Sequence, residues 1–227
     1  MSTDTTLTLR GTVDNLNATF HPFLHFDGKY SIGLADITFW NVIQNVVHKS
    51  IFVVGNTRLT RVVRDGYYNF SDIQAYFKEV LPEWNGKIEK HNSKVRLICG
   101  NYSFDFQSDD SLREYFGFEA KVFEQGTVAE SVTHLKINPV TRIRVLCNVS
   151  GGSYNNGKLS HELFSFCPRK GYLEYINERP NYINFQTLLT HHISAIHIRL
   201  TDENFRPINL QNEVVELRLI IKKCVDD

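Results

Sequence analysis

Three histidines near the C-terminus form the densest group of side chains that could bind a metal ion. His191 and His192 are adjacent, and His197 follows on a segment with strand-like alternation. Imidazoles that converge on one point are ordinary zinc ligands. In a regular strand, however, His191 and His197 lie about 20 Å apart, which is too far for one ion. We interpret the three as exposed polar residues before and on a strand, and we predict no metal site.

Other residues with catalytic potential lack the spacing of known motifs. His161 and Glu162 are adjacent and do not form the His-Glu-x-x-His pattern of zinc peptidases. The pairs Asp109–Asp110 and Asp226–Asp227 are interpreted as solvated charges. The sequence contains no Gly-x-Ser-x-Gly motif and no phosphate-binding loop. We therefore expect no catalytic residues and no cofactor, in a protein that is not an enzyme.

One mildly basic and aromatic stretch suggests contact with nucleic acid. It contains Arg58, Arg61 and Arg64, followed by Tyr67 and Tyr68. The whole chain has 25 Lys plus Arg against 25 Asp plus Glu, so its formal net charge is zero. Because affinity for nucleic acid depends largely on neutralising phosphates, this balance argues against such a partner. We interpret the stretch as a solvated strand edge and expect no nucleic-acid partner.

Composition also bears on the cellular compartment. Residues 1–6 lack the basic and apolar regions of a signal peptide, and no apolar run reaches the roughly 18–20 residues of a membrane helix. The four cysteines, Cys99, Cys147, Cys167 and Cys224, are widely spaced. We expect synthesis in the cytosol, free buried thiols and no membrane partner.

Alternation of apolar and polar residues predicts a β protein. The clearest case is the pair of segments 195–200 and 215–221, in which every second residue is apolar, and we predict that they form a final hairpin. On this pattern Leu217 is buried, and Arg218 lies on the wet face and tolerates substitution. Further strands are expected at 5–13, 19–26, 30–40, 51–54, 59–63, 94–99, 102–106, 133–137, 141–149, 159–167 and 172–176. Hairpin turns are expected at 27–28, 55–56 and 100–101.

Two short helices interrupt the strands. Ser71 is expected to cap a helix that ends before Pro82, with Gln74 completing a capping box. A second helix at 111–116 is expected to end at Gly117. Strands spaced by roughly 8–12 residues are typical of a jelly-roll β-sandwich. We therefore predict an all-β fold, a single jelly-roll domain over residues 1–227, with a helix-containing insertion at about 64–118.

Five segments together resemble one known family. They follow one another in the family's order: Phe26–Asn41, with an acidic-Gly-aromatic turn and a Gly-Leu-x-Asp-Ile strand; Gly66–Ile73, which begins Gly-Tyr-Tyr; Leu112–Phe118, a short helix ending in Gly-Phe; Arg144–Val149; and Ile196–Ile208 with Val215–Ile221. This order, over nearly the full chain, resembles the minor capsid, or penton, proteins of Polinton/Maverick elements and adintovirus-like viruses. The chain departs from them in the final turn, where Glu203-Asn204-Phe205 stands without a glycine.

The resemblance implies a structural protein of the virion. It implies a homopentamer at the five-fold vertices of an icosahedral capsid, with the major capsid protein as its other partner. Such a protein is made in the host cytoplasm and assembled there or in the nucleus. The alternative is a β-sandwich binding module for carbohydrate or protein, for which Tyr67, Tyr68, Tyr154 and Tyr172 are the candidate aromatic residues. An enzyme ranks third.

Overall fold

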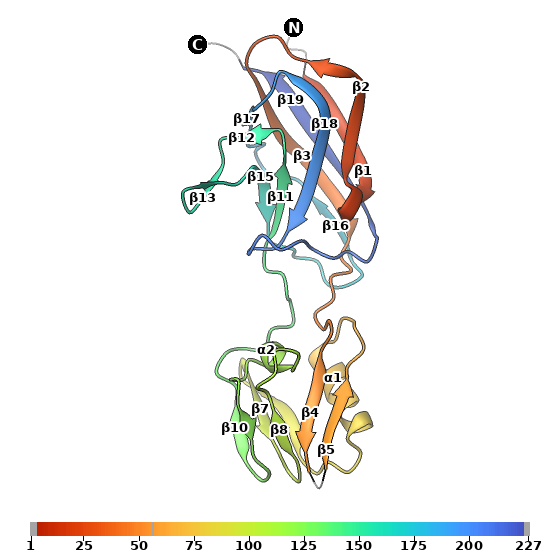
Figure 1. Cartoon of the computed structure of the whole chain (residues 1–227), viewed down its shortest axis with the longest axis vertical. Helices are drawn as coiled ribbons and strands as arrows, with labels where there is room; N and C mark the ends of the chain where they lie inside the picture. Colours follow the sequence, from red (N-terminus) through yellow and green to blue (C-terminus); the bar gives the residue numbers. More distant parts are fainter. Residues whose placement is uncertain (1–3, 56, 225–227) are drawn as a thin grey trace. The chain divides into compact units, whose positions relative to one another are not determined.

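The chain forms two compact units, each with its own hydrophobic core (Figure 1). The structure is a computed structural model that describes residues 4–55 and 57–224. Unit 1 contains residues 4–43 and 140–224 of this described part, and unit 2 is Gln44–Pro139. We expected one domain with an insertion at about 64–118. The structure differs because segments on both sides of that range share the core of the inserted part, among them Val46, Ile51 and Phe123.

Unit 1 is an antiparallel sandwich of two main sheets. The six-stranded sheet has the order β1 (Thr5–Thr12), β19 (Val214–Lys223), β3 (Tyr30–Trp40), β17 (Gln186–Leu188) and β12 (Ser150–Gly151), and β16 (Tyr175–Glu178) also pairs with β3. The four-stranded sheet has the order β15 (Glu162–Phe166), β11 (Ile143–Cys147), β18 (His192–Thr201) and β2 (Asn17–His25). A 3₁₀ turn (Val13–Asn15) joins β1 to β2, and β13 (Tyr154–Asn155) pairs with β14 (Lys158–Leu159). The all-β jelly-roll prediction is confirmed.

Consecutive strands of unit 1 mostly belong to opposite sheets. The chain passes from β1 to β2 to β3, and from β18 to β19, by crossing from one sheet to the other each time. Two predicted hairpins are therefore wrong, the one at 27–28 and the final pair. Alternation in the final pair shows that each strand has one buried face, but it does not show which strand lies beside it. Likewise, Asp27-Gly28 marks a turn but does not show that the two strands it joins pair with each other.

The burial pattern of the last two strands agrees with the prediction. Ile196, Ile198 and Leu200 of β18 are at most 3% exposed, and Leu217 of β19 is fully buried. Arg218, however, is not an isolated surface residue. Its guanidinium group donates hydrogen bonds to Asp36, whose side chain is only 10% exposed. The expectation that Arg218 tolerates substitution is corrected for this reason.

Unit 2 is built from two small sheets and two helices around an aromatic core. One sheet has the order β5 (Arg58–Val62), β4 (Ser50–Val54), β8 (Ser103–Asp105) and β9 (Val122–Phe123). The other has the order β10 (Val128–Glu130), β7 (Lys94–Ile98) and β6 (Lys87–His91). The helices are α1 (Phe70–Val80) and α2 (Arg113–Phe116). The core contains the buried rings of Phe77, Phe104, Phe106, Phe116, Phe118 and Phe123.

Both helices were predicted, with errors at their first residues. The cap of α1 is Asn69, and Asp72 completes its capping box, so the predicted caps Ser71 and Gln74 are wrong. An Asn side chain accepts a backbone N–H as well as Ser does, and either residue fits the sequence pattern. Gly117 ends α2 as predicted, with a φ of +80°. A Cβ there would lie 2.5 Å from the carbonyl oxygen of Thr133, so a side chain does not fit.

Strand pairing in unit 2 was predicted correctly only for the most local hairpin. Strands β4 and β5 pair across the turn at 55–56, of which residue 56 lies outside the described residues. The predicted hairpin at 100–101 is wrong because β7 pairs with β6 and β10, whereas β8 pairs with β4 and β9. Residues 133–137 are described by the structure and do not form the expected strand. Strand β6 was not predicted from the sequence.

We predict that Leu217→Asp prevents unit 1 from folding. Leu217 is fully buried in the sandwich core, and an unpaired carboxylate there costs about 4–5 kcal/mol or more, close to the whole stability of a typical domain. The matched control is Arg199→Asp, at an exposed position of β18. Urea unfolding followed by circular dichroism distinguishes the two variants. Equal unfolding midpoints would show that the assigned inner face is wrong.

We also predict that residues 44–139 fold when expressed alone. This unit has its own core, and its two ends meet where the Asn45 side-chain amide donates to the carbonyl of Ile137 at 2.9 Å. A cooperative thermal transition of the isolated fragment, with dispersed amide signals in NMR, is the expected result. A fragment with random-coil signals would contradict the assignment of an independent core.

Candidate interaction surface

The outer face of the six-stranded sheet carries an exposed pair of aromatic side chains. Trp40 at the end of β3 lies opposite Tyr175 of β16, and their ring centroids are 5.4 Å apart in an edge-to-face arrangement. Each residue is 47% exposed. Trp and Tyr are the residue types most enriched at the centres of protein interfaces.

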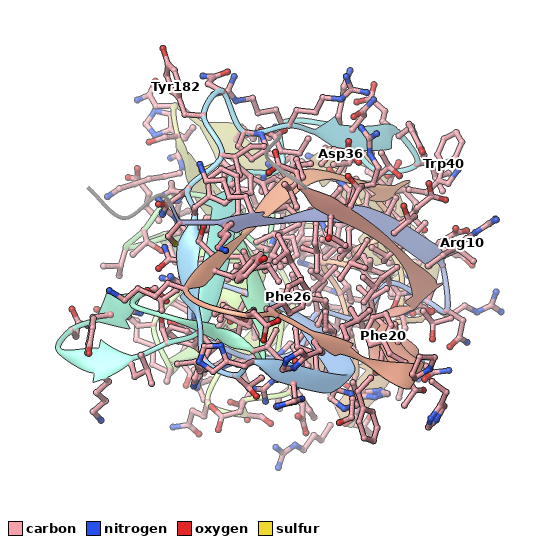
Figure 2. The ribbon with its side chains drawn as sticks, turned by 90° about the horizontal axis from the view of Figure 1, so that it is seen from above. Arg10, Phe20, Phe26, Asp36, Trp40 and Tyr182 are labelled. Atoms are coloured by element: carbon pink, nitrogen blue, oxygen red, sulfur yellow. The ribbon has the colours of Figure 1, made fainter. Side chains whose placement is uncertain are left out.

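A shallow hollow of about 320 Å³ adjoins this pair. We call the whole feature the Trp40 shelf; it consists of Arg10, Thr38, Trp40, Tyr175, Glu213, Val214 and Glu216. Val214 adds a further apolar side chain that is 43% exposed. Arg10 faces Glu216 across the β1–β19 ladder, with 3.9 Å between the charged groups. Two carboxylates and one guanidinium therefore border the aromatic surface, and Figure 2 shows Arg10 and Trp40 at the outer rim of the ribbon.

A bulge in β3 turns Trp40 outward. Ile32 and Leu34 point into the core, so strict alternation would also point Trp40 inward. The register slips by one residue at Ala35, since Arg218 pairs with Asp36 and Leu219 pairs with Leu34. After the slip the buried apolar residues are Ile37 and Phe39. Bulges of this kind change the direction of a side chain without ending the strand.

The Asp36–Arg218 ion pair lies at the bulge. The Arg218 Nε atom is 2.7 Å from Asp36 Oδ2, and a second guanidinium nitrogen donates to the same oxygen. The hydrogen bond and the charge of Asp36 raise the pKa of Arg218 above its ordinary value. Because Asp36 is mostly buried, its carboxylate depends on this partner for compensation.

A second exposed apolar site lies on β2. Strands β2 and β18 pair at Thr19–Ala195 and again at Leu24–Ile193. Between these two pairs β2 has residues 20–23, whereas β18 has only Ser194. We call residues 20–23 the β2 arch. Phe23 on the arch is 58% exposed, and its ring is 6.4 Å from that of His21. The other aromatic residue of the arch, Phe20, packs against the core.

His191 lies just before β18, His192 and His197 lie on it, and all three are exposed, as the sequence predicts. His192 lies opposite His25 and His197 opposite Asn17 on the β18–β2 ladder. Within residues 4–55 and 57–224, no three His, Cys, Asp or Glu side chains gather as a set of metal ligands. No sequence pattern predicts that His25 neighbours His192, because the two are 167 positions apart.

The other charged candidates have structural partners. Glu162 forms an ion pair with Arg144, whose guanidinium lies 4.6 Å from the ring centre of Phe205. Asp109 pairs with Arg113 at the start of α2. Asp226 and Asp227 lie outside the described residues.

The basic and aromatic stretch at 58–68 is also held by local contacts. Arg58 pairs with Asp105, and Arg61 donates to the carbonyl of Val80. The Tyr68 hydroxyl donates to the carbonyl of Arg64, and burial raises the pKa of this hydroxyl. Arg58 and Arg61 are exposed on β5, an edge strand of its sheet, which agrees with the interpretation of a solvated strand edge.

The four tyrosines proposed for a binding module are divided between the two units. Tyr67 and Tyr68 belong to unit 2, and Tyr154 and Tyr172 to unit 1. Tyr172 packs against the sandwich core, whereas Tyr154 is 70% exposed on β13. The sequence reasoning missed the Trp40–Tyr175 pair, because its formation requires β16 to pair with β3.

All four cysteines carry free thiols, but only two are buried. Cys99 and Cys147 are buried, Cys167 is exposed and Cys224 is intermediate. Burial raises the pKa of Cys147 to about 11, and it also raises the pKa of Cys99. These two thiols are therefore protonated at neutral pH, which is unsuited to nucleophilic catalysis. Among the described helices, none is long and apolar enough to cross a membrane.

The two-sheet sandwich of unit 1 and the small sheets of unit 2 give the chain an all-β jelly-roll fold. No family model matches the sequence, and no curated protein matches it. Among solved structures, the chain is similar to the mavirus penton protein, determined as a selenomethionine-labelled crystal structure. The match has a TM-score of 0.51 and 13% sequence identity, and it covers 98% of this chain and 100% of that chain. At this identity the likeness establishes the fold.

We predict that Arg218→Ala lowers the free energy of unfolding more than the loss of an exposed ion pair does, because it leaves the buried Asp36 carboxylate without its partner. Arg10→Ala is the matched control. It removes an exposed pair with a 3.9 Å separation and is expected to cost less than about 1 kcal/mol. Chemical denaturation measures both values. If the two variants were equally stable, the ion pair at the bulge would have no special role.

Proposed function

We propose that this protein is a structural component of a viral capsid and forms the pentameric vertex of an icosahedral shell. The observation that supports this most strongly is the likeness to the mavirus penton protein over the full length of both chains. The order of sequence segments shared with penton proteins of Polinton/Maverick elements supports it independently. A role in assembly also fits a molecule that carries an exposed aromatic pair on a sheet face.

The proposed partners are other copies of this chain and the major capsid protein. A closed ring needs two different surfaces on each subunit, because every contact joins unlike faces. The Trp40 shelf and the β2 arch are two such surfaces within unit 1, and each presents exposed aromatic rings. The proposed location is the virion, after synthesis in the host cytoplasm and assembly there or in the nucleus. The proposed role is structural and not catalytic.

A second candidate function is carbohydrate binding at the Trp40 shelf. Apolar faces of sugar rings stack on Trp and Tyr side chains, while carboxylates and guanidinium groups bind hydroxyls. The shelf offers both kinds of group beside a hollow of about 320 Å³. For this candidate function, the Trp40 shelf replaces the four tyrosines considered from the sequence as the binding site.

Co-expression with the major capsid protein of the same genome tests the vertex proposal. We predict that purified particles contain this chain and that the double variant Trp40→Ala/Tyr175→Ala reduces its incorporation more than tenfold. Loss of two central aromatic residues from an interface costs about 2 kcal/mol or more. Tyr154→Ala is the matched control, because it removes an exposed tyrosine from β13.

Two outcomes would contradict the proposal. Particles that form without this chain would exclude a vertex role, and full incorporation of the double variant would exclude the Trp40 shelf as a contact. A glycan array separates the second candidate, since specific glycan binding that is lost in the same double variant would favour the binding module.

A further inference from the structure

A cross-strand pair of histidines closes one end of the four-stranded sheet. His25 at the end of β2 lies directly opposite His192 at the start of β18. Their ring centroids are 4.3 Å apart, and the two Nδ1 atoms are separated by 3.1 Å. Both residues are exposed.

The Asp27 carboxylate determines which nitrogen of His25 carries the proton. Asp27 Oδ1 lies 2.7 Å from His25 Nε2. An ionised carboxylate only accepts hydrogen bonds, so His25 donates from Nε2. In the neutral imidazole the lone pair is then on Nδ1, the atom that faces His192. Metal-binding histidines have this arrangement, in which the far nitrogen donates to a carboxylate and the near nitrogen binds the ion.

The separation of the two nitrogens fits a shared ion. Zinc–imidazole bonds are about 2.0–2.1 Å long, so two such ligands at a tetrahedral angle lie about 3.3 Å apart. The observed 3.1 Å is within a few tenths of an ångström of this distance. Imidazole ligands suit Zn²⁺, Ni²⁺ and Cu²⁺, and affinity among these ions is generally highest for Cu²⁺.

We propose that His25 and His192 bind a divalent transition-metal ion through their Nδ1 atoms. Asp27 orients His25 from the outer shell, and water completes the coordination. The site is distinct from the Trp40 shelf and does not depend on the vertex proposal.

The ion would stabilise the C-terminal end of the edge strand β2, which has few pairing contacts with β18. Beyond the β2 arch, the ladder contains only the pairs Leu24–Ile193 and His25–His192. One further hydrogen bond follows, from the Phe26 N–H to the carbonyl of His191 at 3.0 Å. An ion bound to both strands cross-links them in the folded state, and it therefore stabilises that state in proportion to its occupancy.

Isothermal titration of the full chain with ZnCl₂ and, separately, CuCl₂ tests the proposal. The expected result is one saturable site, with tighter binding of Cu²⁺, and a melting temperature that rises with ion concentration. His25→Ala and His192→Ala should each abolish this site. Asp27→Asn should weaken binding about 10- to 100-fold, the usual effect of losing an outer-shell carboxylate.

His197→Ala is the matched control, because it removes an exposed histidine from the same strand. Circular dichroism of the metal-free variants establishes that each is folded. In the wild type, the electron paramagnetic resonance spectrum of bound Cu²⁺ should show coupling to two nitrogens. Absence of saturable binding by the wild type would overturn the proposal. Binding that survives in folded His25→Ala, or that is lost equally in His197→Ala, would overturn it as well.

Discussion

The one-residue bulge in β3 is the constraint on which the outer surface of unit 1 depends. It allows Ile32 and Leu34 before the slip, and Ile37 and Phe39 after it, to point into the same core. The same slip places Trp40 outside, where Tyr175 meets it across the ladder. The Asp36–Arg218 ion pair lies at the slip and compensates a carboxylate that is mostly buried. The core and the proposed contact surface are thus coupled through one strand.

Local patterns predicted the elements but not their neighbours. Alternation identified β18 and β19 because each has one buried face, and the short β4–β5 hairpin followed from its turn. Pairing between strands far apart in sequence leaves no local signal. The false hairpins at 27–28 and at the C-terminus arose because a jelly-roll sandwich sends successive strands to opposite sheets. The boundaries of unit 2 were missed for a related reason, because they depend on which segments share a core.

The candidate surface was less predictable than the fold. Neither Trp40–Tyr175 nor His25–His192 is close in sequence, and each pair exists only through strand register. The sequence showed His192 only beside His191, whereas in the structure its cross-strand neighbour is His25, which in turn contacts Asp27. Arg218 was correctly placed on the outer face, yet its buried partner Asp36 depends on the bulge. Functional surfaces of sheets therefore require the register, which alternation alone does not supply.

The central claim is that this penton-like fold serves as a capsid vertex. The most direct test is a cryo-electron microscopy map of particles assembled from this chain and the major capsid protein of the same genome. Five copies of the two-unit chain around each five-fold axis, with the Trp40 shelf in the contact between neighbouring copies, is the predicted result. Density at the vertices that fits a different protein, or that cannot accommodate the sandwich of unit 1, would contradict it.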